Sequence, residues 1–240
     1  MDRNHSDRNH LDRILVCSGL CMAQGDTRLD LELAAGEFVA LREVPDRHES
    51  DVLLAAATLR RPATGRLAIC GQAAEFHRHH QLLPLRSRIG YVGPSSALVS
   101  DLSLRDNLLL GHRYFGREEE ATARVLDLAR TMRLGPLLDV KPALLPFECQ
   151  RVAIFVRELA KEPRLIILDQ PCLGLSEQAS RLICRLLAEE KARGVACLLR
   201  AEAPFLSLAD RVLLLEAGQP ARELSVEAGG RAPAGASASG

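Results

Sequence analysis

The sequence predicts an α/β fold with a parallel sheet at its centre. Residues 165–168, LIIL, form a run that is too short for a helix and too apolar for a half-solvated edge, which is typical of a strand buried on both faces of a parallel sheet. The run ends abruptly at Asp169, and we expect this carboxylate at the carboxyl end of the strand, where open α/β sheets place their ligands. With 240 residues and 47% hydrophobic content, the chain is long enough to bury one large core.

The overall charge excludes some partners. Lysine plus arginine and aspartate plus glutamate each total 31, so the net charge is zero and gives no reason to expect a nucleic-acid partner or an anionic membrane surface. No apolar run approaches the roughly 20 residues of a membrane span. The first ten residues are too polar for a signal peptide, so we expect a cytoplasmic chain with an unfolded leader at residues 1–10, although His5 and His10 leave a metal-binding tail open.

The seven cysteines are odd in number and scattered, and several lie inside apolar segments such as LAIC and RLICRLL. We interpret them as reduced core residues, since a free cysteine behaves as a small hydrophobe. Cys17 and Cys21 lack a second Cys or His pair at metal-ligand spacing, so a zinc site is not expected.

The N-terminal part alternates strands and turns. Residues 11–17 and 29–33 are expected to be two edge strands joined at Gly25, and Gly36 marks the turn into a third strand at residues 37–44. An apolar helix at residues 51–59 and a short strand at residues 66–71 follow. The histidine-rich segment at residues 76–80 could bind a metal, but we favour a solvated connector.

From residue 12 to about residue 220 the chain resembles an ATP-binding cassette (ABC) ATPase. The resemblance is carried by GEFVAL, VLLAAATL, RIGYVG, LSLRDNLLLG, CQRVAIFVRELAKEP, LIILDQP and LADRVLLLEAG, in that order. It implies a RecA-like P-loop NTPase-type core with an antiparallel β subdomain and an inserted helical subdomain at about residues 93–160. The domain would cover residues 11–222, and residues 223–240, which are rich in small side chains, would form a disordered tail.

The family's phosphate loop, GxxGxGK[ST][ST], falls on residues 43–51, and its chemistry is lost there. Such a loop needs glycines so that backbone N–H groups can wrap a triphosphate, and a lysine to neutralise the phosphate oxygens. The glycines are replaced by Glu43, Asp46 and His48, the lysine by Glu49, and only Ser50 is retained. At an effective dielectric constant of about 20, a carboxylate about 4 Å from a phosphate charge costs roughly 4 kcal/mol before screening. An active enzyme whose loop is misaligned by one residue is the alternative, but no lysine occurs between Gly36 and Gly65.

Residues 46–51 also have a structural interpretation. Asp46, followed three residues later by Glu49, has the form of a capping box, and Asp51 adds a carboxylate to the first turn of the helix. We therefore predict a helix N-terminus that is stable without a nucleotide. A divalent cation is an alternative ligand for the acidic and imidazole groups of this region, Asp46, His48, Glu49, Asp51 and Asp169.

The remaining motifs of the family are altered as well, with one exception. The resemblance places Asp169 at the Walker B carboxylate, which is retained, but it places Gln170 at the catalytic glutamate, and an amide cannot act as a general base toward water. The Q-loop glutamine corresponds to Pro94, the switch histidine to Ala201, the D-loop aspartate to Ser176 and the adenine-stacking aromatic to about Gln24. The signature LSGGQ is represented by Leu144, Leu145, Pro146, Phe147 and Glu148, where both glycines are lost.

Together these substitutions predict a pseudo-ATPase with no catalytic residue, no ATP and no metal, although the family binds ATP and Mg²⁺. The resemblance implies a structural or regulatory subunit on the inner face of the membrane, whose partners are a membrane-embedded permease and a second, active ABC ATPase. Because the phosphate loop and the signature are both altered, a one-to-one heterodimer with an active cassette would contain two incomplete sites. The alternatives are an ABC protein that still binds or hydrolyses ATP, and a soluble regulator unconnected to transport.

Residues 98–112, LVSDLSLRDNLLLGH, are interpreted as the apolar helix that in the family borders the groove for the permease. Packing within the helical subdomain explains some of the same leucines. In form this helix is similar to that of cassettes from lipid-trafficking importers of the mammalian-cell-entry (Mce) type.

Overall fold

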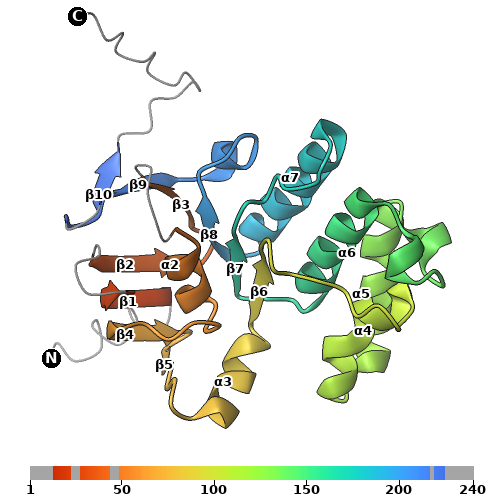
Figure 1. Ribbon diagram of the computed structural model, residues 1–240, viewed down its shortest axis with the longest axis horizontal. Helices are drawn as coiled ribbons and strands as arrows, with labels where there is room; N and C mark the ends of the chain where they lie inside the picture. The colour runs from red at the N-terminus through yellow and green to blue at the C-terminus, as the bar shows by residue number, and fades with distance from the viewer. Residues whose placement is uncertain (1–12, 23–27, 44–48, 217–218, 225–240) are drawn as a thin grey trace, which may run out of the picture.

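The computed structural model describes residues 13–22, 28–43, 49–216 and 219–224, and it describes only the backbone at residues 43, 49, 50 and 79. Figure 1 shows an antiparallel sheet at one end of the molecule, a mostly parallel sheet in the middle and a group of helices at the other end. The predicted leader, Gln24, Gly25 and most of the predicted tail lie outside the described residues.

The antiparallel sheet has the strand order β2-β1-β4-β5. Its strands are β1 (Arg13–Cys21), β2 (Leu29–Ala34), β4 (Thr64–Ile69) and β5 (Gln72–Ala73). The prediction of β1 as an edge strand is wrong, because β1 pairs with β2 on one side and with β4 on the other. The sequence carries the reason, since apolar residues of β1 point to both faces and Ile14, Leu15 and Leu20 are all buried. β2 does lie at an edge, and its buried and exposed residues alternate.

The second sheet has the order β10-β9-β3-β8-β7-β6 and is parallel except for its last strand, β10. Its strands are β3 (Phe38–Glu43), β6 (Ile89–Val92), β7 (Leu165–Leu168), β8 (Ala196–Arg200), β9 (Arg211–Leu215) and β10 (Arg222–Leu224). All four residues of β7 are buried between β6 and β8, which confirms the interpretation of the LIIL run.

Helices flank this sheet (Figure 1). They are α2 (Glu49–Ala56), α3 (His79–Arg86), α4 (Leu104–Tyr114), α5 (Glu118–Thr131), α6 (Phe147–Ala160) and α7 (Glu177–Ala192), with short 3-10 turns η1 (Gly135–Leu137), η2 (Pro142–Leu144) and η3 (Phe205–Leu208). The helices α4 to α6 follow β6 and precede β7, which is where the resemblance expects a helical subdomain. Among the described residues, no helix is long and apolar enough to cross a bilayer.

Two helix predictions need correction. The segment at residues 76–80 is not wholly a solvated connector, because α3 begins at His79 and buries Leu82 and Leu85 under the sheet. Residues 98–103 are not helical: Ser103 caps α4 by accepting a hydrogen bond from the Asp106 N–H at 3.1 Å. The fully buried Asn107 holds the preceding segment in place, accepting from the Val99 N–H at 2.6 Å and donating to the Val99 carbonyl at 3.0 Å.

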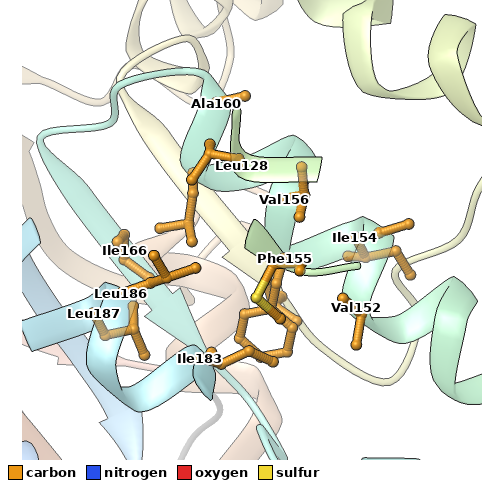
Figure 2. Packing of buried hydrophobic residues seen from close by; sticks show 14 of the residues in the cluster. Leu128, Val152, Ile154, Phe155, Val156, Ala160, Ile166, Ile183, Leu186 and Leu187 are labelled. Carbon is orange, nitrogen blue, oxygen red and sulfur yellow. The ribbon is translucent and has the colours of Figure 1, made fainter. Parts of the chain in front are cut away.

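The largest apolar cluster joins the helical group to the sheet (Figure 2). Phe155 on α6 is 1% exposed, and its ring stacks on that of Phe205 with the centroids 6.2 Å apart. Ile183 and Leu187 on α7 and Ile166 on β7 belong to the same cluster, so one core spans the helical group and the parallel sheet.

A buried ion pair links α5 of the helical group to α7. Glu190 on α7 is 5% exposed and accepts from Arg124 Nη2 on α5 at 2.9 Å and from Arg193 Nη1 at 2.7 Å. Arg124 Nη2 also donates to the Leu159 carbonyl of α6 at 3.2 Å. One arginine therefore connects α5, α6 and α7.

The seven cysteines form no disulfide with one another, in keeping with the prediction of reduced thiols. Cys17, Cys21 and Cys197 are buried core residues, whereas the other four are half-buried. Burial, and less strongly the nearby Asp30 carboxylate, raise the pKa of Cys17 to about 12.

The Cys17 thiol should make stability depend on pH. In the folded chain it stays protonated above its ordinary pKa of 9.0, whereas in the unfolded chain it ionises. This contribution to stability is full below pH 9 and is lost as the pH rises toward the folded value. Between pH 8 and pH 10 we expect the wild type to lose about 1.4 kcal/mol more unfolding free energy than Cys17→Ala. Urea denaturation at both pH values measures the difference, and equal losses in the two proteins would contradict it.

Candidate functional site

The predicted site residues gather at the carboxyl edge of the parallel sheet. Asp169 follows β7 directly, Ala201 follows β8, and Pro94 lies two residues beyond β6. Because these strands are parallel and adjacent, their ends meet at one edge. Glu43 ends β3 in the same sheet, and the backbone of Glu49 and Ser50 opens α2. Asp46 and His48 lie outside the described residues.

Asp169 forms an ion pair with Arg200, which the sequence analysis did not identify. Arg200 Nε lies 3.3 Å from Asp169 Oδ1, and the Asp169 side chain is only 1% exposed. Neither carboxylate oxygen accepts a hydrogen bond of ordinary geometry from the described residues, so the contact is mainly one of charge. A buried carboxylate requires such a partner, because taking an isolated charge out of water is costly.

A signal for Arg200 was present in the sequence. The strand ACLLR is apolar until its last residue, and the register pairs Leu168 of β7 with Leu199 of β8. The residues that follow this pair, Asp169 and Arg200, therefore stand side by side at the sheet edge. Recognising them required the strand pairing, which spacing along the chain does not provide.

A second arginine and a tyrosine lie near the ends of β6 and β7. Arg151 on α6 is 2% exposed and donates from Nη1 to the Gly93 carbonyl at 3.0 Å and from Nε to the Leu173 carbonyl at 3.1 Å. It thereby joins the segments after β6 and β7. Burial, followed by the negative charge of Asp169, raises the pKa of the Tyr91 phenol.

Asp51, in the first turn of α2, has a cationic partner from beyond the end of that helix. It is 7% exposed and forms an ion pair with Arg60, beyond the end of α2. The sequence analysis overlooked Arg60 because nine residues separate it from Asp51 along the chain. This arginine offsets the Asp51 charge within the chain itself.

Gln170, at the position of the catalytic glutamate, has a left-handed backbone with φ of 50°. Few non-glycine residues adopt this conformation. Its carbonyl accepts from the Leu173 N–H at 3.1 Å and closes a turn after β7. The residue has a structural part in the turn, and its amide supplies no general base.

The signature-equivalent residues are bound to the D-loop-equivalent segment. Glu148 Oε1 accepts from the Ser176 N–H at 2.6 Å, and hydrogen bonding to the Ser176 side chain, followed by that to its backbone, lowers the pKa of Glu148. Phe147 packs over Gly174, whose positive φ of 71° and close contact exclude a larger residue. Leu145 is buried, Pro146 is exposed, and Leu144 and Phe147 are 78% and 58% exposed. The segment thus presents apolar side chains where the family presents glycine backbone.

The charges around two carboxylates determine how the described residues would meet Mg²⁺. The two carboxylates at the site, Asp51 and Asp169, each have an arginine of the chain as a counter-ion. Within the described ranges, no group of three or more His, Cys, Asp or Glu side chains could hold a metal ion. The divalent-cation alternative that includes Asp46 and His48 depends on residues outside those ranges.

Comparisons with known proteins identify relatives of the whole cassette. No family model matches the chain. It is 29% identical over 200 residues to Nod factor export ATP-binding protein I of Burkholderia lata, covering 81% of this chain and 64% of that protein. It is 32% identical over 200 residues to the maltose/maltodextrin import ATP-binding protein MalK of Yersinia pestis, covering 81% of this chain and 52% of the relative. The chain therefore spans about half to two thirds of the length of these relatives.

Solved structures agree on the fold. The dimeric structure of MJ0796, a bacterial ABC transporter cassette, superposes with a TM-score of 0.77 at 21% identity, covering 89% of this chain and 99% of that one. An ATP-binding subunit of an ABC transporter gives a TM-score of 0.75 at 24% identity, covering 88% and 90%. The predicted P-loop NTPase-type fold is thereby confirmed. The chain therefore has the fold of ATP-binding cassettes, and about four fifths of it is similar in sequence to ATP-binding proteins of ABC transporters.

Proposed function

We propose that this chain is a cassette subunit of a membrane transport complex that neither binds nor hydrolyses ATP, and that acts as a structural or regulatory partner. The observation that carries the proposal is the buried Asp169–Arg200 ion pair. The Arg200 guanidinium lies beside Asp169, which corresponds to the carboxylate that would hold the metal in the family. A cation arriving at Asp169 would have to compete with a positive charge of the protein itself.

The phosphate-loop region supports the same conclusion. Its sequence contains Glu43, Asp46, His48 and Glu49 in place of three glycines and a lysine. Phosphate binding at a helix N-terminus depends on free backbone N–H groups and on a favourable charge, and a glutamate in the lysine position reverses that charge. Gln170 stands in place of the catalytic glutamate, and an amide cannot activate water as a general base.

Nucleotide binding tests the proposal directly. Titration of the purified chain with a fluorescent ATP analogue and Mg²⁺ should give a dissociation constant weaker than about 1 mM, equivalent to about −4.1 kcal/mol. The Glu49→Lys variant should not restore binding, because the glycine positions remain occupied by larger residues. MalK, measured in parallel, shows that the assay detects a nucleotide-binding cassette. Micromolar affinity that depends on Mg²⁺ would contradict the proposal.

The second candidate is an ABC cassette that still binds or hydrolyses ATP, and the names of the relatives favour it. The Nod factor and maltose relatives are both called ATP-binding proteins. This candidate requires Arg200 to leave Asp169 when a nucleotide arrives. The same titration decides between the two candidates.

The proposed partners are a membrane-embedded permease and a second, active ABC ATPase, with this chain held at the cytoplasmic face of the membrane. Support comes from the maltose relative, whose name describes an import protein. A groove of about 340 Å³ between the ends of α2 and α3, β6 and α6 provides a place for the permease to dock. The substrate and the direction of transport are not part of the proposal.

A further inference from the structure

A cavity of about 510 Å³ lies where the end of α5 meets the first turns of α6 and α7. Its apolar lining includes Met132, Leu134 and Val152, which belong to the core, and the half-buried Leu182 of α7. Among the described residues, the lining includes neither Asp169 nor any part of α2. Cavities of this size with a mainly apolar lining and a few polar groups are typical of sites for small organic ligands.

The two carboxylates at this cavity are engaged within the chain. Glu148 Oε1 accepts from the Ser176 N–H at 2.6 Å, and Glu177 forms an ion pair with Arg181. The Ser176 side chain caps α7 by accepting from the Ala179 N–H at 3.2 Å. The start of α7 is therefore already occupied by groups of the chain itself.

Two further arginines at the cavity are not neutralised in this way. Arg133 follows the end of α5, and Arg185 lies one turn after Arg181 on α7. In the part of the chain that the structure describes, neither the Arg133 nor the Arg185 side chain forms an ion pair or a hydrogen bond. Three cations and two carboxylates give the cavity a formal charge of +1, so its charge and its apolar lining together favour an anion with an apolar body.

We propose that this cavity binds a small amphipathic anion, a molecule with an apolar body and one carboxylate, which would connect α5, α6 and α7. The apolar body would cover Leu134, Val152 and Leu182. The carboxylate would accept from Arg133 and Arg185, because a planar guanidinium matches the geometry of a carboxylate. The inference goes beyond the proposed function and does not depend on whether the chain binds ATP. Such a ligand would act on the junction between the helical group and α7, which is a place where a regulatory subunit could be controlled without a nucleotide.

Calorimetric titration of the full chain with three probes tests the two features separately. Octanoate carries both features, octanol carries the apolar body alone, and acetate carries the carboxylate alone. We expect octanoate to bind at a single site with a dissociation constant below about 1 mM, and octanol and acetate to bind at least about tenfold more weakly.

A matched pair of variants tests the two arginines. Arg133→Gln/Arg185→Gln should weaken octanoate binding about tenfold, which corresponds to about 1.4 kcal/mol, and should leave octanol binding unchanged. Arg105→Gln/Arg117→Gln removes two charges elsewhere on the helical group, from residues that do not line the cavity, and should leave octanoate binding unchanged. Circular dichroism must show that both double variants are folded.

Cys149 lines the cavity and reports where the probe binds in the wild type, whatever the variants do. Saturating octanoate should slow the alkylation of Cys149 by iodoacetamide, followed by peptide mass spectrometry. Cys70, which is also half-buried but follows β4 of the antiparallel sheet, should react at an unchanged rate. Affinity weaker than about 1 mM, equal affinities for octanoate and octanol, equal affinities in the two folded double variants, or binding that leaves Cys149 unprotected would each overturn the inference. Nucleotide titration tests the proposed function separately, so the two can fail independently.

Discussion

Replacing Arg200 by leucine should destabilise the folded chain by about 3–5 kcal/mol, because it leaves the Asp169 charge buried without its counter-ion. Asp169 is 1% exposed, so water cannot replace the lost guanidinium. Urea denaturation at pH 7 measures the loss. A metal-binding carboxylate without a structural counter-ion would predict no such loss, which makes the result informative about function as well as stability.

Two further variants make the Arg200 result specific. Asp169→Asn/Arg200→Leu removes both charges and should recover most of the stability lost in the single variant. Arg105→Leu removes an arginine from an ion pair with Asp139, whose side chain is 84% exposed, and should change stability by less than about 1 kcal/mol. A loss of that small size in Arg200→Leu would show that the Asp169 pair is not structural.

Replacing Phe155 by alanine should cost about 3–5 kcal/mol of unfolding free energy, because it removes a buried aromatic ring at the junction of the helical group and the parallel sheet. The ring is 1% exposed and lies among Val152, Ile183 and Leu187, as Figure 2 shows. For a chain of this size the melting temperature should fall by roughly 10 °C. Differential scanning calorimetry measures both the shift and whether one transition remains.

Phe147→Ala is the matched control, since it makes the same chemical change eight residues earlier on the same helix. Its side chain is 58% exposed, so the loss should stay below about 1 kcal/mol. Similar losses for the two phenylalanines would contradict the assignment of Phe155 to the core.

The sequence predicted the centre of the fold well because burial leaves a simple pattern there. The apolar run of β7 and the acid that ends it were both identified, and the comparisons confirm the cassette fold. The position of β1 was wrong because adjacency in a sheet is a property of pairing between distant segments. The start of α4 was missed because Asn107 holds residues 99–103 out of the helix through tertiary hydrogen bonds.

Only part of the site was predicted from the sequence, because its ion pairs also depend on contacts that spacing along the chain does not show. The loss of the glycines and of the catalytic glutamate can be seen in the sequence alone. The loss of ATP binding and hydrolysis that we infer from it remains a prediction. Arg60 lies nine residues after its partner Asp51, and Arg200 lies on the strand next to that of Asp169. Only the three-dimensional arrangement reveals these arginines as counter-ions. In the structure, Asp51 and Asp169 are each paired with an arginine of the chain.

The contacts of Arg124 have a mechanical consequence. The groove is lined by α6, the carbonyl of Leu159 on α6 is bound by Arg124, and Arg124 is bound in turn by Glu190 on α7. Moving α5 and α6 together against α7 would break the hydrogen bond from Arg124 to the buried Glu190. A displacement of α6 is therefore passed to α7 on the same face of the sheet, because Arg124 connects the two helices.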